Sequence, residues 1–240
     1  MGRARQRKQT RVESPSKAAV APRPHSTLRE YFVTIVVCTI LALFVTTYIV
    51  HPMTVPTPSM VPTILVGDRL LIDKFSLRNE FTAGFAGTPR HTIRRGDVVV
   101  FRFPPQPEVL YVKRAMGLPG ETVEVRHRKV FINGQPVEDA SASHIDPEER
   151  TARDNFGPLQ LDDRSYFMMG DNRDDSADSR FWGPLDKNMI IGRPLFVFWS
   201  FEDPAYNPNS TTGETITEYA NRVIHFFDRT RWKRTFKIIR

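Results

Sequence analysis

Two residues, Ser59 and Lys113, have side chains suited to nucleophilic catalysis. Ser59 lies in the stretch Val55–Thr63, which contains three prolines. Each proline fixes its own φ and favours an extended conformation in the residue before it, so this stretch is predicted to be a stiff, extended ribbon. Such a ribbon would hold the serine hydroxyl at a defined place. A serine among prolines is also typical of a surface linker, and the local sequence leaves both interpretations open.

Lys113 follows Leu110, Tyr111 and Val112, an apolar run that predicts a β-strand. Lysine is rarely buried, and burial would disfavour its charged form, lower its pKa and make the amine a base near neutral pH. Ser–Lys pairs replace the Ser–His–Asp triad in some hydrolases. Strand alternation supports the opposite interpretation, in which Lys113 lies on the solvent face beside Tyr111.

Other chemistries find little support in the sequence. The six histidines form no His-x-x-x-His pair, and Cys38 is the only cysteine, so neither a zinc site nor an internal disulfide is predicted. The acidic stretch 171–178 does not match a calcium loop, because positions six and twelve counted from Asp174 are Ser179 and Leu185. The sequence contains no phosphate-binding glycine loop and no dinucleotide fingerprint. We therefore expect no metal and no cofactor.

The residues that hold Ser59 follow a long apolar run, Tyr31–Val50, which contains twenty residues without a charge. This length is enough to cross a bilayer. A cleaved secretory signal would have a shorter apolar region followed by a small-x-small site, so a retained anchor is favoured. The basic residues of segment 1–30 place the N-terminus inside. Nine extended residues span about 30 Å, so Ser59 is expected close to the outer edge of the membrane.

From Ile64 onward, short β runs alternate with Gly and Pro, which predicts a mainly β domain, a barrel or sandwich of coiled antiparallel sheets. The polar stretches 78–95 and 140–163 are expected to be excursions from it, and Tyr219–Phe227 is compatible with a short helix. The basic C-terminal end is compatible with a lipid surface or a solvated tail, and the solvated tail is favoured. The predicted plan is a basic disordered tail (1–30), a membrane anchor (31–50), an extracytoplasmic β domain (51–203) and a C-terminal segment (204–240).

Four sequence blocks follow the anchor in order, and their spacing and content are specific. They are Ser59-Met60-x-Pro62-Thr63, Gly96–Phe101, Tyr111–Glu121 and Gly170–Gly183. Together they resemble the bacterial type I signal peptidases, over roughly residues 31–201. The last block contains Gly-Asp-Asn-Arg-Asp and Asp-Ser-Arg-x-Trp-Gly, and it is long enough to make the probability of a chance match very small.

The resemblance implies a role for each matching residue. Ser59 would be the nucleophile, Lys113 the general base, and Ser176 the serine that orients the lysine. Asp178 and Arg180 would form a structural acid–base pair.

The resemblance also implies an oxyanion hole and substrate pockets. The hole would use the backbone N–H of Ser59 and the hydroxyl of Thr57, although Pro58 stands where Gram-negative relatives have glycine. This proline should stiffen the loop. Five residues would line pockets for small side chains: Val55, Pro56, Met60, Tyr111 and Val112.

The implied function is a membrane-anchored serine endopeptidase that removes signal peptides from exported preproteins after a small-x-small motif. It would act on the outer face of the bacterial cytoplasmic membrane, with the lipid bilayer and preproteins as partners. A non-enzymatic, membrane-tethered β domain that binds partners at the cell surface is the alternative from another class. A self-cleaving repressor-like Ser–Lys protease is disfavoured by the anchor, and nucleic-acid binding through the basic tails is not expected. The sequence does not indicate an oligomeric state.

Overall fold

The computed structural model describes residues 27–74, 92–202 and 222–239. The chain divides into two compact units, Met1–Leu41 and Ala42–Arg240. Residues 1–26, 75–91 and 203–221 lie outside the described residues, and they include most of the predicted tail 1–30 and most of the predicted excursion 78–95.

One apolar helix opens the described chain. Helix α1 (Thr27–Phe44) continues into the π-helical turn η1 (Val45–Ile49), so that 23 residues form a continuous helical segment. An 18-residue stretch of this segment has a mean hydropathy of 2.4. The segment is long and apolar enough to cross a membrane, and none of its most apolar stretch is buried. The segment begins four residues before the predicted anchor.

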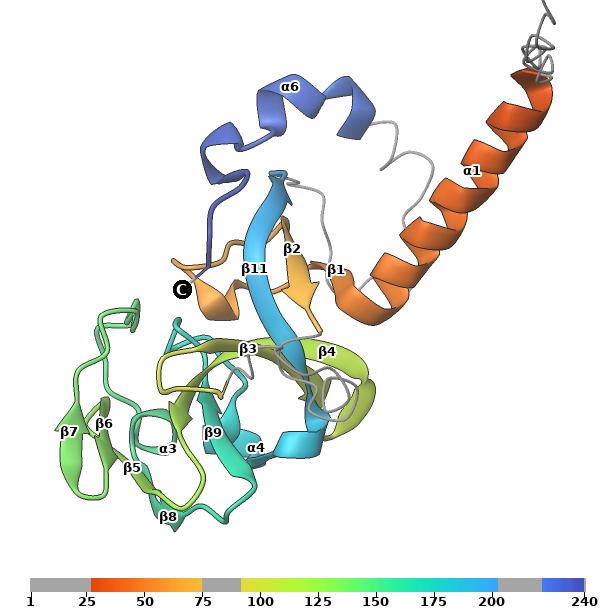
Figure 1. Cartoon of the computed structure of the whole chain (residues 1–240). Coiled ribbons are helices and arrows are strands. Elements are labelled where there is room, and N and C mark those ends of the chain that lie inside the picture. The colour runs from red at the N-terminus through yellow and green to blue at the C-terminus, as the bar shows by residue number, and fades with distance from the viewer. Residues whose placement is uncertain (1–26, 75–91, 203–221, 240) are drawn as a thin grey trace, which may run out of the picture. The chain divides into compact units, whose positions relative to one another are not determined.

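The larger unit is built mainly from antiparallel strands, which confirms the predicted fold class (Figure 1). Seven strands form one sheet, in the spatial order β1, β2, β11, β3, β4, β9, β10. Their bounds are β1 Val50–Thr54, β2 Asp68–Asp73, β3 Val98–Phe103, β4 Gln106–Gly117, β9 Ser165–Met169, β10 Leu185–Asp186 and β11 Ile190–Ser200. The strand β2 alternates buried and half-buried residues, as a strand with one core face should.

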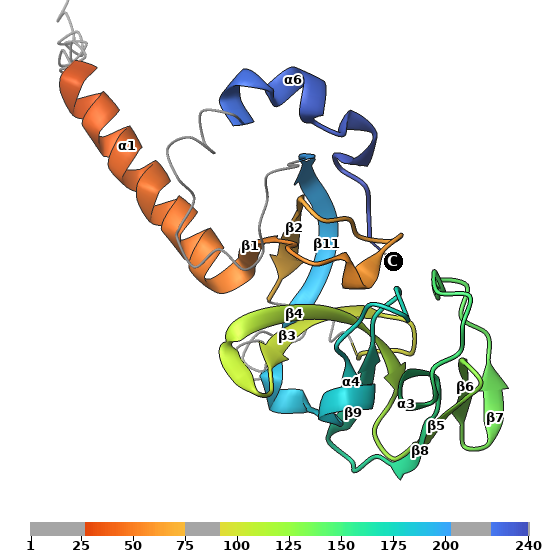
Figure 2. The same cartoon turned by 180° about the vertical axis from the view of Figure 1, so that it is seen from behind.

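A second sheet of four strands lies beside the first and is also antiparallel. Its order is β7 (Gln135–Val137), β6 (Lys129–Ile132), β5 (Thr122–Arg126) and β8 (Phe156–Gln160). The prediction that 140–163 is an excursion is wrong for its second half, because β8 pairs with β5. The helices α3 (Thr151–Asp154) and α4 (Ser179–Trp182) are one turn each, and α4 lies beside β9 (Figure 2).

The large sheet curls around its own core. One cluster joins Leu70 of β2, Val100 of β3, Val112 of β4 and Val197 of β11, although β2 and β4 are separated by two strands in the sheet. A flat sheet could not bring these side chains together, whereas a strongly twisted sheet can. This curling brings the connection between β1 and β2 close to β4.

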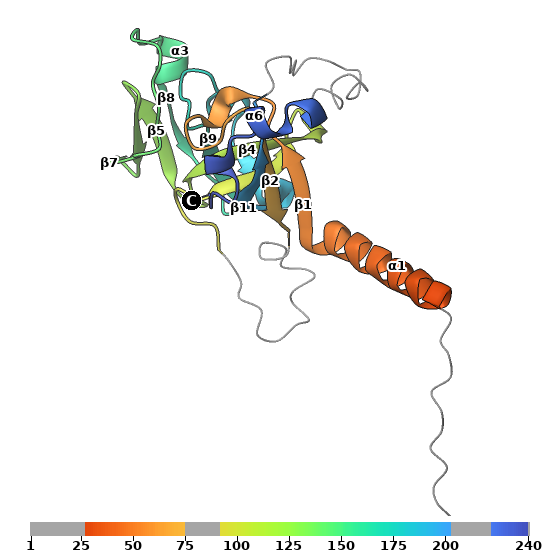
Figure 3. The same ribbon diagram turned by 90° about the horizontal axis from the view of Figure 1, so that it is seen from above.

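The C-terminal segment packs against the sheet. The helix α6 (Phe226–Arg229) and the 3-10 turn η4 (Trp232–Arg234) lie near β2 and β11 (Figure 3). Bridges join Phe201 to Thr230 and Phe196 to Ile238. The expectation of a solvated tail is therefore wrong for the backbone of residues 230–239. The side chains of Trp232, Lys233, Phe236, Lys237 and Ile238 are exposed, as that expectation implies. The predicted helix at 219–227 is helical where it is described, at residues 222–224 and from Phe226.

Candidate active site

Ser59 lies in the connection between β1 and β2, residues 55–67, which we name the Ser59 loop. Thr57 is extended, and the following turn η2 (Pro58–Met60) is a 3-10 helix whose proline occupies the first position, where its missing N–H costs nothing. Met60 and Ile64 are fully buried, and the Ile64 N–H donates to the Met60 carbonyl at 2.9 Å. The loop is thus anchored by core side chains, and Ser59 is only 5% exposed. These contacts exclude the surface-linker interpretation.

Lys113 comes from the second half of β4, where six consecutive residues are buried. The strand passes through the interior with both faces covered, so alternation does not bring Lys113 to the solvent. Its side chain is 3% exposed, and its Nζ lies 2.6 Å from Ser59 Oγ. The structure therefore brings together the two residues that the sequence singled out.

The environment of Lys113 favours its neutral form. Burial lowers the pKa of its amine from 10.5 to about 8, because an ammonium loses its hydration in the interior. Asp178 and Asp171 act in the opposite direction and limit this decrease in pKa. A neutral amine with a free electron pair at 2.6 Å from a hydroxyl can accept its proton, so this pair can generate a nucleophilic serine oxygen.

Thr57 also approaches the serine. Its Oγ1 lies 3.3 Å from Ser59 Oγ, and the residue is exposed at the surface. A hydroxyl so close to the nucleophile is within reach of an oxyanion that forms next to it.

Ser176 is buried near the pair, but its Oγ makes no hydrogen bond among the described residues. The predicted hydrogen bond to Lys113 is thus not formed in this structure. The Ser176 side chain instead packs against the Cα of Gly170. A Cβ at Gly170 would lie 2.3 Å from Ser176 Oγ and 2.5 Å from the carbonyl oxygen of Ser59.

Sequence reasoning missed two residues that hold the Ser59 backbone. The Asn172 N–H donates to the Ser59 carbonyl at 3.1 Å, and its side-chain amide donates to the Pro58 carbonyl at 3.4 Å. Gly170 is the second, because only a residue without a side chain allows this close approach. Both lie in the last sequence block, where the run Gly170-Asp171-Asn172 was the available signal.

Asp178 and Arg180 form a buried, bidentate ion pair. Arg180 Nε donates to Asp178 Oδ1 at 2.9 Å and its Nη2 donates to Oδ2 at 2.8 Å. The same carboxylate accepts the Gly170 N–H at 3.0 Å. Charge-assisted pairs of this geometry are strong, so the pair fixes the backbone that lies against Ser59.

A second buried pair, which sequence reasoning missed, lies next to the lysine. Arg114 donates to both carboxylate oxygens of Asp171 at 2.7 Å. Its guanidinium also donates to the Gly96 carbonyl at 2.5 Å and to Thr63 Oγ1 at 3.4 Å. Since β4 is buried on both faces here, a charge at position 114 requires these partners.

The five predicted pocket residues are placed differently from one another. Val55, Met60 and Val112 belong to the buried core cluster beside the Ser59 loop. Pro56 and Tyr111 are half-buried, and the Tyr111 ring lies 5.2 Å from Lys113 Nζ. Within the described residues, no three His, Cys, Asp or Glu side chains are grouped as metal ligands would be.

The fold and the site together define a class: a β protein with one apolar N-terminal helix and a buried serine–lysine pair suited to acyl transfer. The family model described as signal peptidase, peptidase S26, matches residues 28–199. The chain belongs to this family.

Individual relatives agree with the family match. Signal peptidase I of Leptolyngbya laminosa is 35% identical over 76% of this chain and 85% of its own length. Signal peptidase I of Bacillus amyloliquefaciens is 33% identical over 81% of this chain and 97% of its own length. A crystal structure of a signal peptidase I from Enterococcus faecalis aligns with 43% of this chain and 97% of its own, with 28% identity. The TM-score of this alignment is 0.37.

Proposed function

We propose that this protein is a membrane-anchored serine endopeptidase that removes signal peptides from exported preproteins with a Ser59–Lys113 dyad. The observation that carries the proposal is the 2.6 Å approach of Lys113 Nζ to Ser59 Oγ in a site where burial lowers the lysine pKa to about 8. Membership of the signal peptidase family supports the substrate class.

In the acylation step, the neutral Lys113 amine takes the proton of the Ser59 hydroxyl while Oγ attacks the carbonyl carbon of the scissile peptide. The carbonyl oxygen becomes an oxyanion, which the backbone N–H of Ser59 and the hydroxyl of Thr57 stabilise. One such donor lowers the barrier by about 3–4 kcal/mol. The Lys113 ammonium then protonates the departing amine nitrogen, the C–N bond breaks, and the signal peptide remains as an ester on Ser59.

Deacylation reverses these roles with water. The neutral Lys113 amine takes a proton from a water molecule whose oxygen attacks the ester carbon. The same ammonium returns that proton to Ser59 Oγ as the C–O bond breaks, so each cycle leaves the enzyme unchanged. The mechanism therefore requires no base other than Lys113, provided that the Lys113 amine is neutral at the start of both steps.

The helical segment Thr27–Ile49 would hold the enzyme beside substrates that are themselves in the membrane, which raises their local concentration. The basic N-terminal residues favour an N-terminus inside and a catalytic unit on the outer face of the cytoplasmic membrane. Narrow pockets near Val55, Pro56, Met60, Tyr111 and Val112 would select small residues before the cleaved bond by steric exclusion.

The test uses the full-length protein in detergent with a purified preprotein. Ser59→Ala and Lys113→Ala should each abolish cleavage, whereas Lys129→Ala, which removes an exposed lysine from β6, should cleave normally. Thermal unfolding of all three variants verifies that the fold is intact. Full activity in either dyad variant would refute the mechanism, and a wild-type protein that binds preproteins without a Ser59-dependent cut would favour the binding-domain alternative.

A further inference from the structure

The end of the chain packs on the loop that carries the proposed nucleophile. Residues 230–239, which we name the C-terminal strap, lie beyond the family match at 28–199. The strap pairs with β11 through backbone hydrogen bonds, among them Phe236 N–H to the Val197 carbonyl at 2.7 Å and Val197 N–H to the Lys237 carbonyl at 2.9 Å. At its end, Ile239 is buried in the same core cluster as Met60 of the Ser59 loop.

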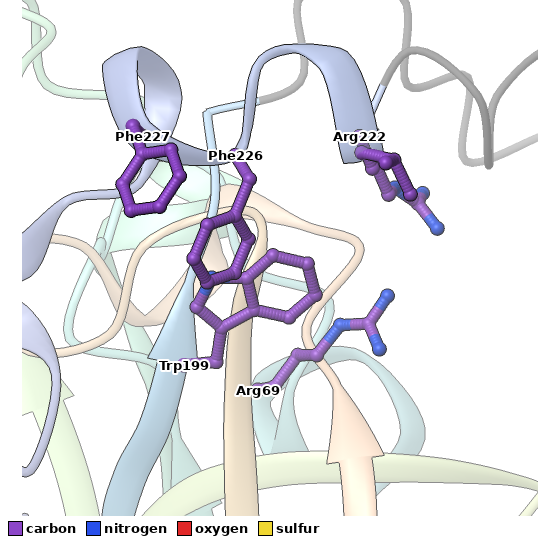
Figure 4. Close-up of a pocket in the computed structure, with 6 residues that line it drawn as sticks. Arg69, Trp199, Arg222, Phe226 and Phe227 are labelled. Atoms are coloured by element: carbon purple, nitrogen blue, oxygen red, sulfur yellow. The ribbon is translucent and has the colours of Figure 1, made fainter.

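The start of the strap is held as firmly. Trp199 Nε1 donates to Thr230 Oγ1 at 3.1 Å, and the Trp199 ring lies 5.9 Å from that of Phe226. Figure 4 shows Phe226 next to Trp199, with Arg69 of β2 beside the indole. The Arg69 guanidinium is 4.6 Å from the centre of the indole ring. Both ends of the strap are therefore anchored on the sheet, and its middle crosses the Ser59 loop.

Arg234, in the middle of the strap, makes one of three polar side-chain contacts to that loop; the others are Arg231 Nη2 to the Val66 carbonyl at 2.6 Å and Lys237 Nζ to the Thr63 carbonyl at 3.5 Å. Arg234 Nε and Nη2 donate to the two carboxylate oxygens of Asp68, at 3.2 and 2.5 Å, and Nη2 also donates to the Thr63 carbonyl at 3.0 Å. Asp68 is fully buried and also accepts the Leu65 N–H and the Ser200 hydroxyl, at 2.9 and 2.6 Å. A fully buried carboxylate needs a cation beside it, so the guanidinium of Arg234 is required to compensate the charge of Asp68.

Thr63 connects this contact to the base. Its carbonyl accepts from Arg234, and its hydroxyl lies 3.4 Å from Arg114 Nη2. Arg114 follows Lys113 on β4 and is fixed by Asp171. The segment just after Ser59 is thus held from the strap on one side and from the lysine strand on the other.

We propose that Arg234 is a positioning residue, which holds the Ser59 loop in the position at which Ser59 Oγ contacts Lys113 Nζ. This inference rests on the proposed function, because it concerns the same dyad. Loss of the Arg234 fork leaves the Thr63 carbonyl with only the longer, exposed contact to Lys237 Nζ at 3.5 Å, so the loop shifts and water reaches the Lys113 amine. A displacement of about 1 Å at reacting atoms can reduce a rate by about a hundredfold.

The experiment compares full-length wild type, Arg234→Gln, Arg234→Lys and the control Lys233→Gln in detergent. Lys233 is exposed and adjacent, so its variant removes the same charge from the strap without touching the Ser59 loop. We expect Arg234→Gln to lower kcat at least roughly tenfold with little change in KM. The acid limb of its pH profile, which is the rise of kcat/KM with increasing pH, should move to higher pH, because a hydrated Lys113 regains a higher pKa. Lys233→Gln should match wild type.

Arg234→Lys keeps the cation that Asp68 needs but lacks the fork that reaches Thr63 at the same time. It should fold, with kcat reduced and its acid limb shifted by less than in Arg234→Gln. If Arg234→Gln does not fold, this variant decides the question. A folded Arg234→Lys variant with wild-type kcat and an unmoved acid limb would overturn the inference. A loss of cleavage activity in Arg234→Gln that is fully explained by the unfolded fraction of that variant would also overturn it.

The wild-type arm separates the two proposals. Ser59-dependent cleavage by wild type together with unaffected Arg234 variants overturns only the positioning role. No cleavage by wild type overturns both the positioning role and the proposed function.

Discussion

The pH dependence of cleavage is the most direct measure of the base. With a pKa of about 8, roughly one Lys113 amine in ten is neutral at pH 7. At its ordinary value of 10.5 the neutral fraction would be roughly one in three thousand, so burial raises it roughly three-hundredfold. We therefore expect kcat/KM to rise about tenfold per pH unit below pH 8 and to level off above it. The assay uses a peptide substrate without titratable groups near the cleaved bond.

Two matched substitutions test whether this rise of kcat/KM below pH 8, the acid limb, reports the ionisation of Lys113. Asp175 is exposed and raises the lysine pKa, so Asp175→Asn should move the limb to lower pH without unfolding the protein. Glu108 is exposed on the same strand, five residues from Lys113, or roughly 17 Å along it. This separation exceeds the Debye length at physiological salt, so Glu108→Gln should leave the limb unmoved. A limb near pH 6.5, or an Asp175→Asn variant that shifts it upward, would refute the argument.

Three further outcomes follow from the same site. Thr57→Val should lower kcat by roughly a hundredfold to a thousandfold with little change in KM, whereas an unchanged kcat would argue against Thr57 as an oxyanion donor. Gly170→Ala should abolish cleavage, because its Cβ would lie 2.5 Å from the Ser59 carbonyl oxygen; wild-type kcat would show that the loop accommodates it. For stability, unfolded Lys113 binds its proton up to about pH 10.5 while the folded residue loses it above about 8, so the free energy of unfolding should rise over that interval. Lys113→Met removes this rise. At pH 7 this variant should have a free energy of unfolding up to about 3 kcal/mol higher than wild type, and therefore a higher unfolding temperature. Thermal unfolding of both proteins at pH 7 and at pH 10 measures the pH-dependent rise and the stabilisation by methionine.

Local sequence patterns predicted the features that depend on neighbouring residues. The uncharged run 31–50 predicted the apolar helix, because spanning a bilayer depends on length and composition alone. Short β runs between Gly and Pro predicted a mainly β fold. The polar stretch 140–163 was misjudged, because β8 is a short edge strand whose exposed residues resemble a loop.

The orientation of Lys113 could not be predicted from alternation. Half of β4 is buried on both faces, and a doubly buried strand has no period of two. The ion pair between Arg114 and Asp171 joins residues 57 positions apart, and its partners could not be matched before the sheet was seen to curl.

By itself, the sequence singled out the two candidate residues and the kind of elements that hold them: a serine in a proline-rich loop after an apolar helix, and a lysine in a strand. Only the tertiary structure decided that the two side chains meet. Ser59 and Lys113 are 54 positions apart on segments that are not adjacent in the sheet, and its curvature brings them to 2.6 Å. It also decided that the C-terminal strap covers the Ser59 loop, because the contacts of Arg234 with Asp68 and Thr63 span more than 160 positions. Such contacts depend on the packing of the whole domain and leave no local pattern in the chain.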